Sequence, residues 1–385
     1  MSAASQTLGK SPLVRVIDAS LVLEGGPVRV TISGMSSPHR VAESLAGAGI
    51  RATVEDGRLT TTSTLTRLVD AVGAVLGLGG AEALAGALDV AVAAWHGPAP
   101  ELVTSAGALD GHRRPTVMGI LNVTPDSFSD GGHHYDPDRH PHLAIGHGKA
   151  LAAAGADVVD VGGESTRPGA EAVPEDEELR RVLPVVEALA ADGLIVSIDT
   201  SKASVARAAV EAGAAIVNDV SGGALDGLLL PTVAELGVPY VLMHMRGTPR
   251  TMQRNPVYAD VVAEVFDFLG EGLQRCIASG IDPRQIVVDP GIGFGKTVDH
   301  NLLLLRRVRE LTSLGRPVLV GTSRKSFLGR VGGGLSEQER LEGSLATAAL
   351  AVANGAAIVR AHDVRETVRV VRVAHAVATG EWAEE

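Results

Sequence analysis

Eight short apolar segments recur along the C-terminal two thirds of the chain, and a longer segment of helical character separates each from the next. They lie at residues 116–123, 157–163, 194–200, 215–220, 239–245, 286–291, 317–323 and 357–363. Continuous rather than alternating apolar residues indicate strands that are buried on both faces, as in a parallel sheet. Several of the intervening segments end in glycine just before the next strand, which is typical of a helix end. Eight strand–helix units over about 260 residues match a (β/α)8 barrel in count and length.

Polar residues stand at the end of nearly every predicted strand, and they favour a barrel over a doubly wound open sheet. A barrel gathers all eight strand ends around one mouth, whereas an open sheet brings together only those near its switch point. The residues concerned are Asn122, residues 164–167, Asp199, Asn218, His244, Asp289, residues 323–325, Arg360 and His362. We therefore expect an α/β chain with a TIM barrel over residues 111–385 and one shared site at its mouth.

Residues 1–110 mix strand-like and helix-like segments, which predicts a small α+β extension. Residues 97–115 are rich in proline, glycine and polar groups, and we interpret them as a linker or domain junction. The extension contains no recognisable set of catalytic residues. A structural or interaction role is therefore the favoured interpretation.

The composition limits the binding partners and the cellular compartment that we expect for the protein. The net charge of −11, without a strongly basic block, argues against a nucleic-acid partner. The single cysteine, Cys276, excludes an intramolecular disulfide and suits a reducing compartment. The N-terminus lacks a secretory signal, and the most apolar stretch, residues 71–95, carries Glu82 and Asp89, unlike a membrane span. We expect a cytoplasmic protein that binds neither nucleic acid nor membrane.

The segment DPGIGFGKT, residues 289–297, superficially resembles a nucleotide-binding loop. That loop has four residues between its glycines, but only three separate Gly291 from Gly295. We instead expect Asp289 to close the sixth strand at the barrel mouth. The glycines then allow a tight turn over the site, and Lys296 is expected to be solvated.

The polar residues at the strand ends form two groups that suit different parts of a substrate. Asp199, Asp289 and Asn218 suit a flat heterocycle with adjacent N–H donors, such as a 2-amino-4-oxo-pyrimidine, and Lys325 complements a ring carbonyl or nitrogen. A structural network of the same carboxylates with Lys325 or Arg360 is the alternative.

Asn122, Arg360 and His362 form the second group and indicate an anionic, phosphorylated substrate. Arginine suits a bidentate phosphate contact, and an asparagine oxygen can ligate Mg²⁺ beside substrate phosphates. The glycine-, proline- and serine-rich segments 124–132 and 165–170 are typical of loops that close over a second substrate.

Together these segments resemble the dihydropteroate synthase family over roughly residues 115–380. The resemblance is carried by MGILNVTPDSFSDGG, DVGGESTRPGA, SIDTSK, IVNDVSGG, LMHMRGTP, DPGIGFGKT, GTSRKSFLG and RAHDV, in that order. It implies a transferase with a (β/α)8 barrel. Such an enzyme joins 6-hydroxymethyl-7,8-dihydropterin diphosphate to 4-aminobenzoate in folate biosynthesis and releases pyrophosphate.

The resemblance also implies residue roles, a magnesium ion and a homodimer. Asp199, Lys325 and Arg360 are the expected catalytic residues. The pterin is expected to be held by Asp199, Asn218, Asp289 and Lys325. Asn122 is expected to bind Mg²⁺ with the diphosphate, helped by Arg360, His362 and Thr166. The aminobenzoate pocket corresponds to Thr166, Arg167, Pro168, Phe294 and Ser326, with Asp126 and Arg167 on the mobile loops.

Three alternatives remain at this stage. A corrinoid-dependent pterin methyltransferase shares the barrel but has no need of TPDSF, STRPG and SRKS. A non-catalytic pterin-binding paralogue predicts binding without pyrophosphate release. Residues 131–142 are rich in histidine and aspartate, but they lack an established ligand spacing, which disfavours a transition-metal site.

Overall fold

The protein is described from a computed structural model, which covers residues 13–17, 28–33, 35, 38–64, 67–68, 71, 81–111, 114–124, 140–167 and 169–382. The chain divides into two compact units. One comprises Met1–Gly97 with Arg309–Gly315, and the other comprises Pro98–Val308 with Arg316–Glu385. The boundary thus falls at Gly97 rather than near residue 110.

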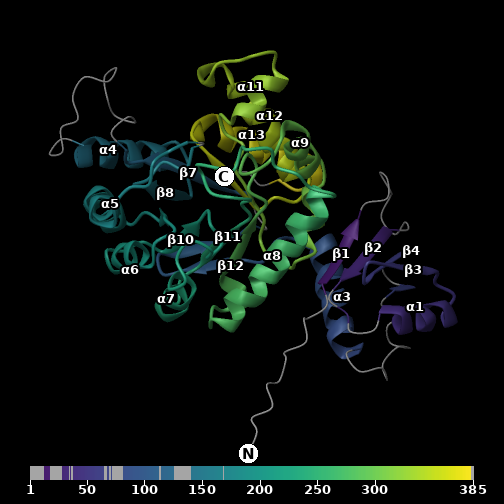
Figure 1. Ribbon diagram of the computed structural model, residues 1–385. Helices are drawn as coiled ribbons and strands as arrows, with labels where there is room; N and C mark the ends of the chain where they lie inside the picture. Colours follow the sequence, from purple (N-terminus) through teal and green to yellow (C-terminus); the bar gives the residue numbers. More distant parts are fainter. Residues whose placement is uncertain are drawn as a thin grey trace, which may run out of the picture. The chain divides into compact units, whose positions relative to one another are not determined.

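The second unit is built on an eight-stranded sheet in which all neighbouring strands are parallel (Figure 1). Its order is β12-β11-β10-β9-β8-β7-β14-β13, and a parallel bridge between Val288 and Val318 joins the two ends. The expected TIM barrel is confirmed. The strands are β7 (Thr116–Asn122), β8 (Val158–Gly162), β9 (Val196–Asp199), β10 (Ile216–Asp219), β11 (Tyr240–Met243), β12 (Ile286–Asp289), β13 (Leu319–Val320) and β14 (Ile358–Ala361).

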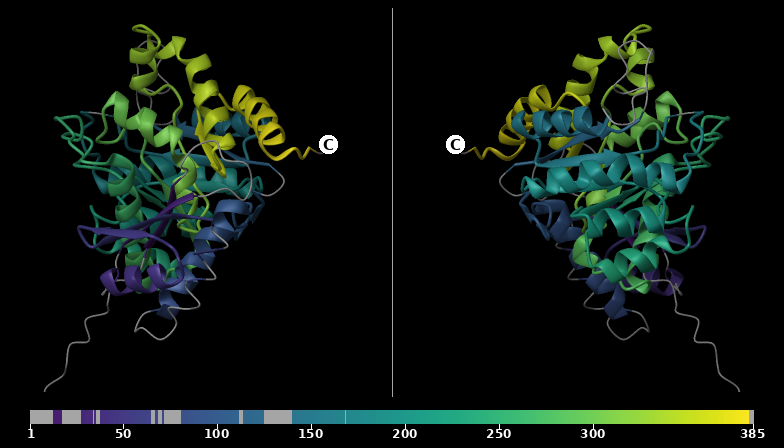
Figure 2. Two further views of the ribbon diagram at one scale, coloured as in Figure 1. Left: turned by 90° about the vertical axis from the view of Figure 1, so that its right-hand side faces the viewer. Right: turned by 90° about the vertical axis from the view of Figure 1, so that its left-hand side faces the viewer.

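Helices follow the strands and surround the barrel (Figures 1 and 2). Local sequence signals set several of their ends: Asp260 caps α8 by accepting from the backbone N–H groups of Val262 and Ala263, and Gly237 and Gly380 end α7 and α13 in the left-handed conformation. The helices are α4 (His140–Ala153), α5 (Glu175–Ala191), α6 (Ala203–Glu211), α7 (Leu229–Leu236), α8 (Val261–Ala278), η2 (Pro283–Gln285), α9 (Val298–Arg306), α10 (Val308–Thr312), α11 (Ser326–Val331), η3 (Glu337–Glu339), α12 (Leu341–Ala353) and α13 (Val364–Thr379).

A short hairpin of β5 (Leu102–Thr104) and β6 (Gly107–Leu109) belongs to the barrel unit. Residues 97–115, interpreted as a linker or domain junction, thus contain both the boundary of the two units and this hairpin. Leu102 and Leu109 are buried in a cluster with residues near the first positions of the strands, at the end opposite the mouth. Their partners there are Met118, Val158, Ile216, Val241, Val287, Leu319 and Ile358.

The first unit contains the antiparallel sheet β1-β2-β4-β3, formed by β1 (Leu13–Ile17), β2 (Val28–Ser33), β4 (Arg58–Ser63) and β3 (Ala52–Glu55). Helices α1 (Pro38–Gly47) and α3 (Ala81–His96) complete an α+β unit, as expected. Segment 309–315 is tied to it, because Val16 N–H donates to the Ser313 hydroxyl at 3.2 Å and Arg15 pairs with buried Glu310 at 3.8 Å. Within the described part of the chain, no helix is long and apolar enough to cross a membrane.

Candidate active site

The centre of the barrel mouth is an arginine held between two carboxylates from neighbouring strands. Arg360, in β14, donates from Nη2 to Oδ2 of Asp199 at 2.7 Å and from Nε to Oδ2 of Asp160 at 2.6 Å. Asp199 is the last residue of β9, and β8 lies next to it in the sheet. The predicted residues Asp199 and Arg360 are therefore in direct contact.

Asp160 was not predicted from the sequence, yet it links two members of the site, Arg360 and Asn218. It lies in the middle of β8 with 0% of its surface exposed, and its Oδ2 also accepts from Nδ2 of Asn218 at 3.0 Å. Its other oxygen, Oδ1, has no hydrogen-bond partner among the described residues. A carboxylate inside an otherwise apolar strand was the available signal, because aspartate is almost never fully buried without partners.

Burial and neighbouring positive charges shift the pKa values of Asp199 and Asp289 in opposite directions. Burial raises the pKa of Asp199 to about 7, against the Arg360 guanidinium, which lowers it. Burial also raises the pKa of Asp289, at the end of β12, while the nearby Lys325 ammonium lowers it. Asp289 accepts the Gly291 backbone N–H at 2.7 Å, so the glycine loop begins directly on this carboxylate.

Lys325 reaches the same site from the turn between β13 and α11. Its ammonium group donates to the Ile292 carbonyl and lies 4.9 Å from the centre of the Phe294 ring. Burial lowers the pKa of Lys325 to about 8. The turn is held by Arg324, whose φ of 57° is left-handed and whose guanidinium pairs with Asp363. Strain of this kind persists only where the surroundings fix it.

His362 follows β14 and is neutral at physiological pH. Burial lowers its pKa to about 3, helped by the Arg360 and Arg324 guanidinium groups. Its Nδ1 lies 3.0 Å from the Ser323 hydroxyl. The neutral ring carries one proton, so His362 offers hydrogen-bonding nitrogens rather than a positive charge.

The remaining predicted residues lie on the rim. Asn122 is half-buried at the end of β7, and Thr166 is half-buried in the segment after β8. Arg167 is exposed and forms an ion pair with Glu337 at 2.9 Å, while Ser326 is exposed at the start of α11. Pro168, Asp126 and most of the histidine-rich segment lie outside the described residues. Within the described ranges, no cluster of three or more His, Cys, Asp or Glu could hold a metal.

The expectation that Lys296 is solvated is wrong. Only 2% of the residue is exposed, and its ammonium group lies 2.8 Å from Nδ1 of His244, 2.9 Å from the Gly291 carbonyl and 3.0 Å from the Phe294 carbonyl. With the His244 carbonyl at 3.4 Å, four acceptors surround this group. Gly291 lies so close to His244 that an added Cβ would be 1.9 Å from its carbonyl oxygen, which explains why the sequence has glycine there.

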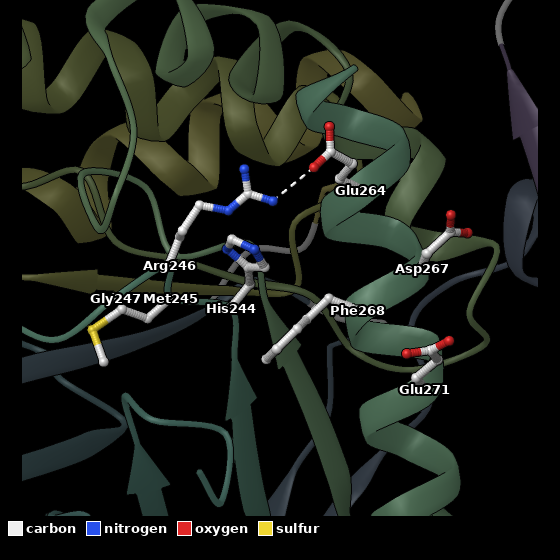
Figure 3. Close-up of a pocket in the computed structure, with 8 residues that line it drawn as sticks. All are labelled: His244, Met245, Arg246, Gly247, Glu264, Asp267, Phe268 and Glu271. Atoms are coloured by element: carbon white, nitrogen blue, oxygen red, sulfur yellow. Dashed lines mark hydrogen bonds and ion pairs between the residues drawn. The ribbon is translucent and has the colours of Figure 1, made fainter. Parts of the chain in front are cut away.

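His244 also borders a surface pocket between the end of β11 and helix α8 (Figure 3). Its ring packs edge-on against Phe268, and burial lowers its pKa to about 2. Arg246 extends across the pocket to Glu264 at 2.7 Å. His244 is therefore a packed, neutral residue that lies between this pocket and the glycine loop.

Comparison with known proteins identifies the family. A sequence profile described as "Pterin binding enzyme" matches residues 118–362. A dihydropteroate synthase from Mycobacterium leprae is 51% identical over 263 residues, which cover 67% of this chain and 91% of the relative. The chain belongs to the dihydropteroate synthase family.

Other members of this family agree with that assignment. The Escherichia coli K12 dihydropteroate synthase is 49% identical over 266 residues, covering 68% of this chain and 91% of that protein. A Xanthomonas albilineans dihydropteroate synthase, solved with 4-aminobenzoic acid, is 48% identical with a TM-score of 0.67 and covers 73% of this chain and 99% of its own. The same enzyme was also solved with 7,8-dihydropteroate, at a TM-score of 0.65. In each case about a quarter to a third of this chain lies outside the match.

Proposed function

We propose that this chain is a dihydropteroate synthase. It condenses 6-hydroxymethyl-7,8-dihydropterin diphosphate with 4-aminobenzoate to give 7,8-dihydropteroate and pyrophosphate. The observation that carries the proposal is the meeting of Asp199, Asn218 and Arg360 around Asp160 at a barrel mouth. This occurs in a chain closely related to enzymes solved with 4-aminobenzoic acid and dihydropteroate.

The pterin is bound by the polar residues at the strand ends. Asp289 and Asp199 offer carboxylate oxygens to the N–H donors of the ring, and Asn218 adds an amide that can both donate and accept. Lys325 donates to a ring carbonyl or nitrogen. Buried carboxylates of this kind favour a ligand with complementary donors, because otherwise their desolvation stays uncompensated.

In the chemical step, the C–O bond to the diphosphate breaks first, and its electron pair leaves with the diphosphate. Arg360 and His362 stabilise the developing negative charge, one as a cation and the other as a neutral donor. The carboxylates of Asp199 and Asp289 offset the positive charge that spreads over the dihydropterin. The aniline nitrogen then forms the C–N bond and releases its proton without a strong base.

Asn122 is the residue that suits a magnesium ion bound with the diphosphate. It offers one amide oxygen at the mouth, and Mg²⁺ commonly uses few protein ligands besides phosphate oxygens and waters. When bound, the ion would neutralise charge on the leaving diphosphate. The absence of a larger ligand cluster among the described residues is compatible with such a site.

The second substrate is bound between the loops. Arg167 provides a guanidinium for the carboxylate of 4-aminobenzoate, and Phe294 provides an aromatic face next to Lys325. Thr166, Pro168 and Ser326 complete this pocket by the family resemblance. A cytoplasmic location is part of the proposal and is compatible with one buried free thiol, Cys276.

A homodimer is likewise proposed. Apolar side chains remain exposed on several barrel helices, and those on α9, α12 and α13 support burial against a second copy. They are Leu302 and Leu303 on α9, Leu350 on α12, and Val373 and Val377 on α13. Light scattering coupled to gel filtration should give twice the chain mass of 39.5 kDa.

A pyrophosphate-release assay with the purified chain tests the function directly. We expect release that requires both the pterin diphosphate and 4-aminobenzoate, with dihydropteroate formed in equal amount. Pterin binding without pyrophosphate release would instead support the non-catalytic alternative. Methyl transfer from a methylated pterin would support the corrinoid-dependent alternative.

A further inference from the structure

Lys202, directly before α6, joins three points of the chain through one ammonium group. Its Nζ lies 2.5 Å from Oε2 of Glu164 and 2.9 Å from the carbonyl oxygen of Val173, and it also donates to Oε2 of Glu178. Three N–H donors therefore meet three acceptors. Glu164 and Val173 lie near the two ends of the segment between β8 and α5, of which we call residues 164–173 the β8–α5 loop.

Thr166 and Arg167 lie on this loop, and few other contacts hold its described residues; just before it, Arg181 donates to the Gly163 carbonyl at 2.8 Å. The loop contains no helix or strand among its described residues. The backbone N–H of Gly169 donates to the Pro249 carbonyl at 3.1 Å, and Arg167 pairs with Glu337 at the surface. A surface ion pair contributes little to holding a loop. Lys202 thus joins both ends of the loop through a single group.

The attachment point itself is rigid and partly buried. The Glu178 side chain is only 1% exposed and also accepts from the Thr200 hydroxyl at 2.7 Å. Burial lowers the pKa of Lys202, but hydrogen bonds to Glu164 and Glu178 raise it above its ordinary value, so the ammonium stays charged. Fixing both ends of a short loop restricts the positions available to its tip.

We propose that Lys202 is a positioning residue for the second substrate. By holding both ends of the β8–α5 loop, it keeps Thr166 and Arg167 where they receive 4-aminobenzoate. This inference rests on the proposed function. Within the described residues, its ammonium group contacts Glu164, Val173 and Glu178 rather than Asp199, Asn218 or Asp289, so its main effect should fall on the loop and not on the pterin.

Steady-state kinetics of Lys202→Met, Lys202→Arg and Lys149→Met test this role. Lys149 is a matched control, because it forms an exposed ion pair with Asp192 on the outside of the barrel. For Lys202→Met we expect the KM for 4-aminobenzoate to rise about tenfold, since misplacement of a substrate-binding group by about 1 Å can have a large effect. The KM for the pterin diphosphate should stay within about twofold. Lys202→Arg should recover most of the loss, because a guanidinium can reach both carboxylates.

Hydrogen exchange without substrates gives a second readout that does not depend on turnover. Peptides covering residues 164–173 should exchange faster in Lys202→Met, while peptides covering β9 should not change. If Lys202→Met fails to fold, Glu164→Gln, which weakens only the loop entry, should shift both readouts in the same direction.

Two results would overturn the inference: unchanged loop exchange, or equal rises in both KM values. An absence of turnover in the unmodified chain would instead refute the proposed function, and loop exchange would still decide whether Lys202 holds the loop.

Discussion

Nη2 of Arg360 lies 2.7 Å from Oδ2 of Asp199, although the sequence assigned these residues to different parts of the pterin substrate. Arg360 was expected at the diphosphate and Asp199 at the ring. Their contact means that the group attracting the leaving diphosphate and the group offsetting the ring cation are electrostatically coupled. The structural network considered as an alternative does exist, and it is compatible with a catalytic role because its members face the barrel mouth.

Replacing Asp199 by asparagine should reduce turnover much more than pterin binding. The amide keeps the shape and a hydrogen-bonding oxygen, but it removes the negative charge that offsets the cation in the transition state. We expect kcat to fall on the order of a hundredfold. The Kd of the pterin, measured by calorimetry, should change by less than about fivefold.

Asp219→Asn is a matched control for this prediction. Asp219 ends the next strand and is bound to the Tyr240 hydroxyl and to Ser221, so its loss should lower the melting temperature rather than kcat. Small and equal changes in kcat and Kd for Asp199→Asn would contradict the electrostatic role of Asp199.

The pH dependence of kcat/KM should form a narrow bell. The charged form of Asp199 is lost as the pH falls through about 7, and the charged form of Lys325 is lost as it rises through about 8. Each limb of the bell reports an apparent pKa that belongs to the coupled site as a whole. Asp199→Asn should remove the acid limb, and Lys325→Met the alkaline limb. A flat profile between pH 6 and 9 would refute the assignment.

The ionisation of Asp199 should also make the free energy of unfolding depend on pH. Because the pKa of Asp199 is higher in the folded chain than its ordinary value, its contribution favours folding at low pH. That contribution is lost as the pH rises through about 7. Urea denaturation should therefore show that the unmodified chain loses stability relative to Asp199→Asn as the pH rises from the ordinary pKa of an aspartate to about 7.

Activity should depend on magnesium, with Asn122 setting the affinity. Treatment with EDTA should abolish pyrophosphate release, and added Mg²⁺ should restore it. Asn122→Ala should raise the Mg²⁺ concentration for half-maximal activity by about tenfold, because one oxygen ligand is lost. Asn122→Asp retains an oxygen at that position and should be affected less. Full turnover in EDTA would contradict the magnesium proposal.

Most of the barrel could be predicted because its strands are continuous apolar runs and its mouth collects their C-terminal ends. That rule is sufficient to place Asp199, Asp289 and Arg360 at one site. It missed Asp160 because this residue lies inside β8 rather than at its end. The β5–β6 hairpin escaped prediction because strands of three residues carry no recognisable periodicity.

Lys296 shows why the burial of a charged side chain could not be predicted from the sequence. Its neighbours in sequence suggest an exposed loop, whereas its acceptors include His244, which lies far away in sequence. Whether a charged side chain is solvated depends on such long-range partners, and one sequence does not contain them.

Lys296→Met should therefore destabilise the protein. Methionine fills similar space, but it leaves the Gly291 and Phe294 carbonyls and the His244 ring nitrogen without their donor. We expect the free energy of unfolding to fall by about 2–4 kcal/mol. Lys149→Met at the surface should stay within about 0.5 kcal/mol. Urea denaturation at constant pH measures both, and equal values for the two variants would show that the buried ammonium contributes nothing.

Removing the extension at two different points should separate its role from that of the hairpin. A chain beginning at Pro98 keeps β5 and β6, whereas one beginning at residue 112 loses Leu102 and Leu109 from the closed end of the barrel. Because none of the predicted site residues lies before Pro98, we expect kcat and both KM values of the longer chain to stay within about twofold. Its melting temperature should fall modestly, since Glu310 and Ser313 lose their partners.

The shorter chain should fold poorly. Truncation of a buried leucine typically costs about 2–5 kcal/mol, and two are lost together with their hairpin. Leu102→Ala in the full chain isolates this effect and should lower the melting temperature while leaving both KM values unchanged. If the chain beginning at Pro98 folds with normal circular dichroism but has lost turnover, the extension takes part in the reaction, and its assignment as a structural appendage is wrong.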